Sequence, residues 1–150
     1  MPMNDKKTGC FTINGNSYWY LDGLLHNHEG PAVIWSNGTK EWYQNGLQHR
    51  LNAPAVTDPN GHEEWWSRGK LHREGGPAVT YADGTQEWWW EGTLHREDGP
   101  AVTSTFSDYC EWHVHDVEMT EEEFEMQKDV KGRKKKADGS LMFVKTEKLI

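Results

Sequence analysis

The stretch DGTQEWWWEGTLHREDGPAV, residues 83–102, contains the signals that the rest of the chain repeats. Two glycine turns flank a run of three tryptophans, and a histidine and a GPAV corner follow. A step of 23 residues relates Gly15, Gly38, Gly61 and Gly84; Trp19, Trp42, Trp65 and Trp88; Gly23, Gly46, Gly69 and Gly92; His26, His49, His72 and His95; and Pro31, Pro54, Pro77 and Pro100. A fixed period of this kind indicates a repeat architecture, here four units and a partial fifth that begins one residue late at Glu111.

Each unit carries two signals for tight β-hairpin turns. Asn-Gly and Asp-Gly dipeptides favour two-residue type I′ loops, and such loops fix the register of the paired strands. If Asp83-Gly84 and Glu91-Gly92 are both two-residue loops, three lines of neighbours follow across the strands. They are Val79, Trp88 and His95; Ala78, Trp89 and Leu94; and Thr80, Glu87 and Arg96.

This register predicts a cross-strand ion pair in three units, namely Glu41 with Arg50, Glu64 with Arg73, and Glu87 with Arg96. In the first unit both positions change together, to Tyr18 and Asn27, and this joint change supports the register. Each repeated histidine is predicted to stack on the tryptophan opposite, as His95 on Trp88, with its polar edge free to meet a backbone carbonyl. The Asp98-Gly99-Pro100 corner then leads into the next strand.

The expected fold class is therefore mainly β, an antiparallel β-hairpin repeat array with a short C-terminal capping helix. Residues 1–117 form the repeat region, 118–136 the capping helix and a basic connector, and 137–150 a C-terminal strand or tail. Thr120 followed by Glu123 is a capping box for a helix of about ten residues that ends before Lys131-Gly132, with Phe124 facing inward.

Composition and charge limit the possible functions. Aliphatic residues are scarce beside nine tryptophans, so aromatic side chains are expected to supply the packing. Residues 1–117 hold 8 Lys/Arg against 16 Asp/Glu, which favours a basic partner and argues against nucleic acid and anionic membranes.

The basic run 131–136 is interpreted as a solvated connector. Two cysteines without a CxxC motif, and no secretory h-region, predict a soluble cytoplasmic protein with reduced thiols; a disulfide remains possible.

The cluster His95-Arg96-Glu97-Asp98 has the residue types of an acid/base site. An active site needs one constellation of unlike groups, whereas this segment recurs in the other units as HNHE, HRLN and HREG. We therefore interpret the repeated histidines, arginines, glutamates and prolines as structural, and expect no catalytic residue, cofactor or metal. His26-Asn27-His28 matches a nuclease motif by letters alone. His113 and His115, with Asp116 nearby, would share a strand face, but no further metal ligand is specified.

The repeat also resembles a known module. Trp66-Ser67-Arg68-Gly69 followed by His72 is similar to the MORN repeat, a β-hairpin unit of the same length. Arg50, Arg73 and Arg96 stand where MORN units usually have glycine. The likeness is closer to the variant LHRxDGPA with DGTxEWW, found in proteins of tailed bacteriophages and large DNA viruses, and it covers about residues 13–125. This resemblance implies a repeat scaffold.

Aromatic residues on both faces of such a sheet require that it coils, dimerises or presents an aromatic stripe to another molecule. The candidate binding surface is Trp42, Tyr43, Trp65, Trp66, Trp88, Trp89 and Trp90. We expect a non-enzymatic scaffold that binds a protein partner through an aromatic, acid-rimmed surface, such as a phage accessory or anti-defence protein that blocks a host factor. The alternatives are a small-ligand, nucleotide-like binder or enzyme with a Trp-lined pocket, and a virion or self-assembly component.

Overall fold

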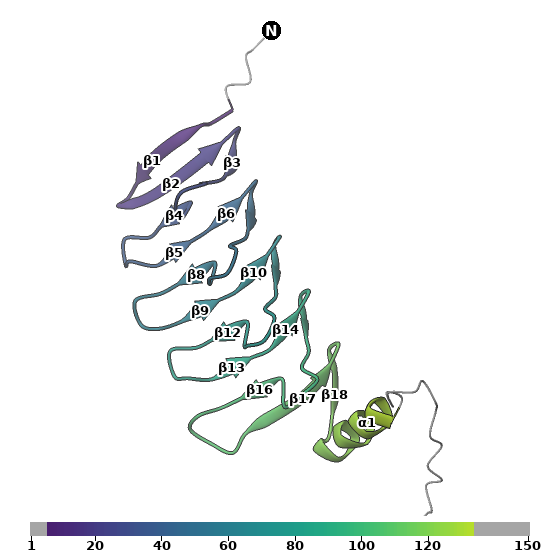
Figure 1. The fold of residues 1–150 in the computed structure, drawn as a ribbon. Helices are drawn as coiled ribbons and strands as arrows, with labels where there is room; N and C mark the ends of the chain where they lie inside the picture. The colour runs from purple at the N-terminus through teal and green to yellow at the C-terminus, as the bar shows by residue number, and fades with distance from the viewer. Residues whose placement is uncertain (1–5, 134–150) are drawn as a thin grey trace, which may run out of the picture.

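The computed structural model describes residues 6–133 as a stack of β-hairpin units closed by one helix (Figure 1). The chain opens with the longest hairpin, and each of three interior units then adds four two-residue strands. The strands are β1 (Gly9–Ile13), β2 (Asn16–Leu21), β3 (Leu24–Leu25), β4 (Val33–Ile34), β5 (Lys40–Glu41), β6 (Tyr43–Gln44), β7 (Leu47–Gln48), β8 (Val56–Thr57), β9 (Glu63–Glu64), β10 (Trp66–Ser67), β11 (Lys70–Leu71), β12 (Val79–Thr80), β13 (Gln86–Glu87), β14 (Trp89–Trp90), β15 (Thr93–Leu94), β16 (Val102–Thr103), β17 (Cys110–Val114) and β18 (Val117–Met119), followed by α1 (Glu121–Arg133). The predicted mainly β hairpin array is confirmed.

One antiparallel sheet runs the length of the stack in the order β1-β2-β4-β5-β8-β9-β12-β13-β16-β17-β18, with β3 beside β2. The hairpins β6–β7, β10–β11 and β14–β15 branch from one edge of it as separate two-stranded sheets. Because each unit hydrogen-bonds only to its neighbours in sequence, the fold is built from local contacts, as in other repeat arrays.

The second turn of each unit has the predicted two-residue form. Tyr43 pairs with Gln48, and the loop residues Asn45 and Gly46 have φ of 50° and 80°, the left-handed values of a type I′ turn. Arg68 and Glu91 adopt the same positive φ, although neither residue favours it. The turn contacts the preceding unit, because Gly46 donates its N–H to the Leu25 carbonyl at 2.8 Å. This hydrogen bond stabilises the turn conformation.

The first turn of each unit differs from the prediction. Trp35 donates its N–H to the Thr39 carbonyl, and Gly38 donates to the Trp35 carbonyl, both at 2.9 Å. The loop is therefore three residues long with glycine in the left-handed position, a form that Asn-Gly also accommodates. Val79 consequently pairs with Glu87 and not with Trp88. A slip of one residue moves every side chain to the other face, so the predicted line of Val79, Trp88 and His95 is wrong in its first member.

The fully buried core consists of small aliphatic residues. Ala32, Ala55, Ala78 and Ala101 have no exposed surface, and Val33, Val56, Val79 and Val102 are 2–8% exposed. The repeated tryptophans are half-buried, so the aromatic side chains pack around this core and do not form its fully buried part. Adjacent residues of a strand point to opposite faces. The Ala-Val pair of each unit therefore supplies one core residue to each side of the sheet.

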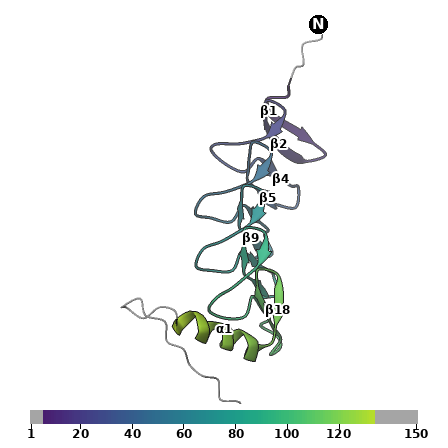
Figure 2. The ribbon, with the colours of Figure 1, turned by 90° about the vertical axis from the view of Figure 1, so that its right-hand side faces the viewer.

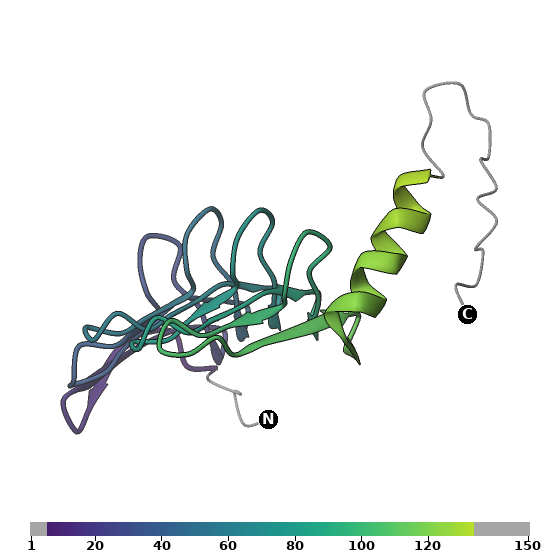
Figure 3. The same ribbon diagram turned by 90° about the horizontal axis from the view of Figure 1, so that it is seen from below.

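Four loops arch over one side of this sheet. We call residues 27–31, 50–54, 73–77 and 96–100 the arches, and the side that they cover the arch side. Figure 2 shows the sheet nearly on edge with the arches on one side, and Figure 3 shows that α1 projects from the same side. The sheet does not close on itself. The chain's own arches cover one aromatic face, an arrangement different from the coiling, dimerisation or exposed stripe that the sequence predicts.

The helix α1 begins at the predicted capping box. Glu123 donates its N–H to Thr120 Oγ1 at 3.2 Å, and its carboxylate accepts the Thr120 N–H at 2.8 Å. Phe124 is 3% exposed and its ring lies 4.7 Å from the Trp112 ring, which confirms the inward position. The helix runs through Lys131, beyond the predicted end, and Lys131 pairs with Glu97 at 3.1 Å. The strand or tail predicted for 137–150 lies outside the described residues.

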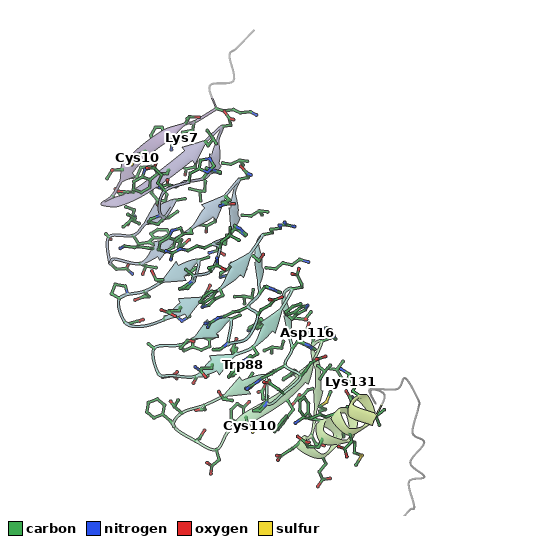
Figure 4. The ribbon with its side chains drawn as sticks, viewed as in Figure 1. Lys7, Cys10, Trp88, Cys110, Asp116 and Lys131 are labelled. Atoms are coloured by element: carbon green, nitrogen blue, oxygen red, sulfur yellow. The ribbon has the colours of Figure 1, made fainter. Side chains whose placement is uncertain are left out.

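Cys10 lies on β1 and Cys110 on β17, at opposite ends of the stack (Figure 4). Both thiols are free and exposed, so these two cysteines do not form a disulfide within the chain. Within residues 6–133, α1 is the one helix, and it is too short and too polar to cross a membrane.

Candidate functional site

The repeated histidines hold neighbouring units together. In each unit, histidine Nδ1 accepts the backbone N–H of the first residue of the next unit's two-residue turn. These bonds join His26 to Asn45 at 3.0 Å, His49 to Arg68 at 3.1 Å, His72 to Glu91 at 3.2 Å and His95 to His115 at 3.2 Å. An accepting Nδ1 requires the neutral ring with its proton on Nε2. The repetition of these histidines every 23 residues therefore has a structural explanation.

The predicted stacking of these histidines on the repeated tryptophans is not observed. The His95 ring stacks on His115 with centroids 4.1 Å apart, and the His72 ring lies 4.4 Å from Trp90. The polar edge meets a backbone N–H and not a carbonyl. Backbone pairing of His95 with Trp88 is confirmed, because the His95 N–H donates to the Trp88 carbonyl at 3.0 Å.

The predicted Glu–Arg ion pairs are also wrong, because the arginines lie on the arch side. The guanidinium carbon lies over a tryptophan ring in three units, at 3.8 Å for Arg50 on Trp42, and at 3.9 Å for Arg73 on Trp65 and Arg96 on Trp88. Each guanidinium also donates to the proline carbonyl of its own arch: Pro54 and Pro77 at 3.0 Å, and Pro100 at 3.1 Å. The arginine therefore fixes the arch in place over the tryptophan ring.

In the first unit a shorter side chain, that of Asn27, holds the arch. Asn27 Nδ2 donates to the Pro31 carbonyl at 3.0 Å, the bond that arginine makes elsewhere. The residue before each arch proline is glycine or alanine. A Cβ at Gly76 or Gly99 would approach the guanidinium to 3.0 Å, a tight contact that the second arch accommodates at Ala53. The joint change to Tyr18 and Asn27 thus reflects two separate environments and not a cross-strand pair.

The glutamates lie on the opposite side of the sheet, in a single line. Backbone register connects Tyr18, Val33, Glu41, Val56, Glu64, Val79, Glu87, Val102 and Glu111 as successive cross-strand partners. We call Glu41, Glu64, Glu87 and Glu111 the carboxylate row, and this face the row side. Two strand spacings of about 4.8 Å separate neighbouring glutamates, so the carboxylates recur roughly every 10 Å.

Each carboxylate of the row is held between two aromatic donors. Glu41 accepts from Trp35 Nε1 at 2.6 Å and from Tyr43 Oη at 2.8 Å. The other pairs of ring donors are His62 and Trp66 on Glu64, Tyr81 and Trp89 on Glu87, and Tyr109 and His113 on Glu111. The row is thus flanked by two lines of aromatic side chains.

The line of donors on the first-turn side was missed, although the sequence contains a signal for it. The residues that face each other across the first turn always include one aromatic ring: Trp35 with Thr39, Asp58 with His62, Tyr81 with Thr85, and Ser104 with Tyr109. The aromatic residue precedes the first turn in one unit and follows it in the next, whereas the glutamate that it contacts stays at one position of the unit. A search of single positions with a fixed period does not detect such an alternation.

In the described part of the chain, no lysine or arginine forms an ion pair with the carboxylate row. Within residues 6–133, the ion pairs of these four glutamates involve only His62, on Glu64, and His113, on Glu111. The Glu64 and Glu111 side chains keep 25% and 29% of their surface exposed. Burial, followed by the charge of Glu87, raises the pKa of Tyr81 to about 12. The phenol therefore remains a donor to the carboxylate at neutral pH.

A separate groove of about 670 Å³ lies on the arch side between the third and fourth arches. Trp88, Trp90, His95 and His115 line it, together with charged arch residues that include Arg96. Asp98 stands at the position that Gly75 occupies in the preceding unit, and its carboxylate accepts a hydrogen bond from Arg96 Nε at 2.7 Å.

The other chemical candidates are dispersed. His113 is buried against Glu111, whereas His115 lies in the turn at φ 49° and stacks on His95, so the two histidines do not share a site. His26 and His28 approach to 3.0 Å through Nε2, but His26 Nδ1 already accepts an N–H, so its Nε2 must carry the proton and cannot bind a metal. Among the described residues no group of three metal-ligating side chains occurs.

The predicted binding surface is divided between the two sides. Alternation along the strands places Trp42, Trp65, Trp88 and Trp90 on the arch side, and Tyr43, Trp66 and Trp89 on the row side. No protein-family model matches the chain, and a search of curated proteins returns no match. The candidate site is therefore defined by the geometry of its own residues.

Proposed function

We propose that this chain is a non-enzymatic, MORN-like repeat scaffold that binds a basic protein partner through the row side. The carboxylate row is the observation that carries this proposal. It presents four carboxylates, fixed in position by aromatic donors, with no lysine or arginine paired to them among residues 6–133. A charged surface that is rigid and uncompensated favours association with a partner of opposite charge.

The resemblance to repeats of tailed-phage and large-DNA-virus proteins extends the proposal. The chain would act in the host cytoplasm as an accessory or anti-defence protein that blocks a host factor by occupying its basic surface. Catalysis is not part of this role, because the repeated histidines serve as acceptors between units.

Affinity capture with matched variants tests the proposal. The full chain, the row variant Glu64→Gln/Glu87→Gln and the arch-side variant Glu63→Gln/Glu74→Gln are used as baits in a bacterial lysate. Both variants lose two charges, but only the first loses them from the row. We expect a stoichiometric partner that the arch-side variant retains and that the row variant loses. A partner retained equally by both, or the absence of any partner, contradicts the proposal.

The arch-side groove supports a second candidate function, the binding of a small aromatic ligand such as a nucleotide. Trp90 is 38% exposed at this groove, and bases stack on exposed indole rings. Titration of adenine and guanine nucleotides against tryptophan fluorescence, with Trp90→Ala as the control, tests this candidate. Unchanged fluorescence with both nucleotides contradicts it.

A further inference from the structure

We propose that the occupant of the row side is an extended peptide segment with a lysine or arginine at every third position, lying along the stack and across the strands. This inference rests on the proposed function and adds the form of the partner. It follows from the spacing of the carboxylates, from the side chains beside them and from the charge of the face.

The spacing selects the conformation of the segment. Neighbouring carboxylates of the row are two strands apart, because one buried valine lies between each pair in the register. This separation is roughly 10 Å. Three residues of a polyproline II helix complete one turn and span about 9 Å, so every third side chain faces the row at nearly this interval. A β-strand covers a similar distance in three residues, but its side chains alternate between faces, so residues three apart point in opposite directions. A helical segment rises only about 1.5 Å per residue and presents its cations at other intervals.

The flanking aromatic side chains suit such a segment. On one side of the row lie Trp35, His62, Tyr81 and Tyr109, and on the other lie Tyr43, Trp66, Trp89 and His113. Tyr81 is 39% and Tyr109 is 56% exposed. Lysine and arginine carry long apolar stems, which pack on aromatic rings while the charged ends reach the carboxylates. Polyproline II segments also bind in aromatic-lined surfaces.

The negative charge of the row predicts that the bound peptide segment is basic. Residues 1–117 carry 16 acidic against 8 basic side chains. Three of those basic residues, Arg50, Arg73 and Arg96, are held over tryptophans on the arch side. Among residues 6–133 no lysine or arginine forms an ion pair with the row, so the cations of a bound segment can pair with it.

Fluorescein-labelled peptides test the spacing directly. The probe is a peptide of four Lys-Pro-Pro triplets, and its matched control has four consecutive lysines followed by eight prolines. Anisotropy titrations use the full chain at low salt. We expect the spaced peptide to bind about tenfold more tightly than the clustered one, because only the spaced lysines reach successive carboxylates together. Binding should weaken as salt is added.

Variants of the protein locate the binding site. Glu64→Gln/Glu87→Gln should weaken binding of the spaced peptide about tenfold, since two charge pairs are lost. Glu63→Gln/Glu74→Gln removes the same charge from exposed positions on the arch side and should leave the affinity unchanged. Circular dichroism of both variants verifies that they are folded.

Each outcome bears on the inference. Equal affinity for the two peptides, with loss in the row variant, overturns the extended segment but keeps the row as a binding surface. Equal affinity of the two protein variants overturns both the inference and the proposed function. Self-association of the free chain that disappears in Lys134→Gln/Lys135→Gln/Lys136→Gln would show that a second copy occupies the row, and this also overturns the inference.

Discussion

The two sides of the sheet bury equivalent small residues but are covered in different ways. On the arch side, the alanine of each unit is fully buried, and in three of the four arches an arginine is held over a tryptophan, as Arg96 is over Trp88 at 3.9 Å. On the row side, the valine lies beside glutamates held by ring donors, as Glu87 is by Trp89 at 2.8 Å. Within residues 6–133, arginines lie on the arch side, whereas no lysine or arginine forms an ion pair with the row. The arch side is therefore structural, and the row side is the face that we propose for a partner.

The largest expected difference between the sides comes from the neighbours Trp88 and Glu87. Trp88→Ala should lower the free energy of unfolding by about 3 kcal/mol, because it removes the surface on which Arg96 and the arch rest. Glu87→Gln should change it by less than about 1 kcal/mol, since it replaces one acceptor by another. Urea denaturation measures both. A larger loss for Glu87→Gln would show that the row is primarily structural.

The arginine itself provides the next effect. Arg96→Ala should cost about 1–2 kcal/mol, because the guanidinium covers Trp88 and donates to the Pro100 carbonyl. Asp98→Ala removes an ion pair whose carboxylate side chain is 81% exposed, and should cost less than about 0.5 kcal/mol. Denaturation midpoints of the two variants compare these contributions. Equal losses would indicate that the ion pair, and not the tryptophan, holds the arginine.

A smaller effect is expected at the junctions between units. His49→Phe keeps an aromatic ring but removes the acceptor of the Arg68 N–H. The exposed N–H then turns to water, so the loss should be about 0.5–1 kcal/mol in urea denaturation. His62→Phe, on the row side, is a comparison that leaves the junction bonds intact. If His49→Phe is as stable as the original chain, the histidine bond does not hold the units together.

Acidification should weaken the arch side through His95. Burial, and then the charge of His115, lowers the pKa of His95; Lys131 acts in the same direction and Glu97 opposes it. The neutral ring is therefore favoured in the folded state. Its contribution to stability is complete above the unfolded-state pKa of about 6.5 and is lost as the pH falls through the lower folded pKa. Denaturation at pH 8 and pH 5 should show a smaller pH dependence for His95→Phe than for the original chain.

Local sequence signals determine much of the fold. The period and the Asn-Gly and Asp-Gly dipeptides predicted the antiparallel hairpin units, the two-residue turn at Asn45-Gly46 and the backbone pairing of Trp88 with His95. The Thr120–Glu123 motif predicted the capping box. These features depend on contacts between residues close in sequence, where turn chemistry and capping are strong local signals.

Only the tertiary structure decided the length of the first turn, and with it which residues share a face. Asn37-Gly38 suits both a two-residue and a three-residue loop, and the choice depends on how the strands pair across units. That choice separates Glu87 from Arg96 and aligns the carboxylate row. The arch is likewise a tertiary feature, because Arg96 reaches Trp88 only after the chain has folded back over the sheet. The sequence by itself determined the repeating unit, and the packing between units decided its two faces.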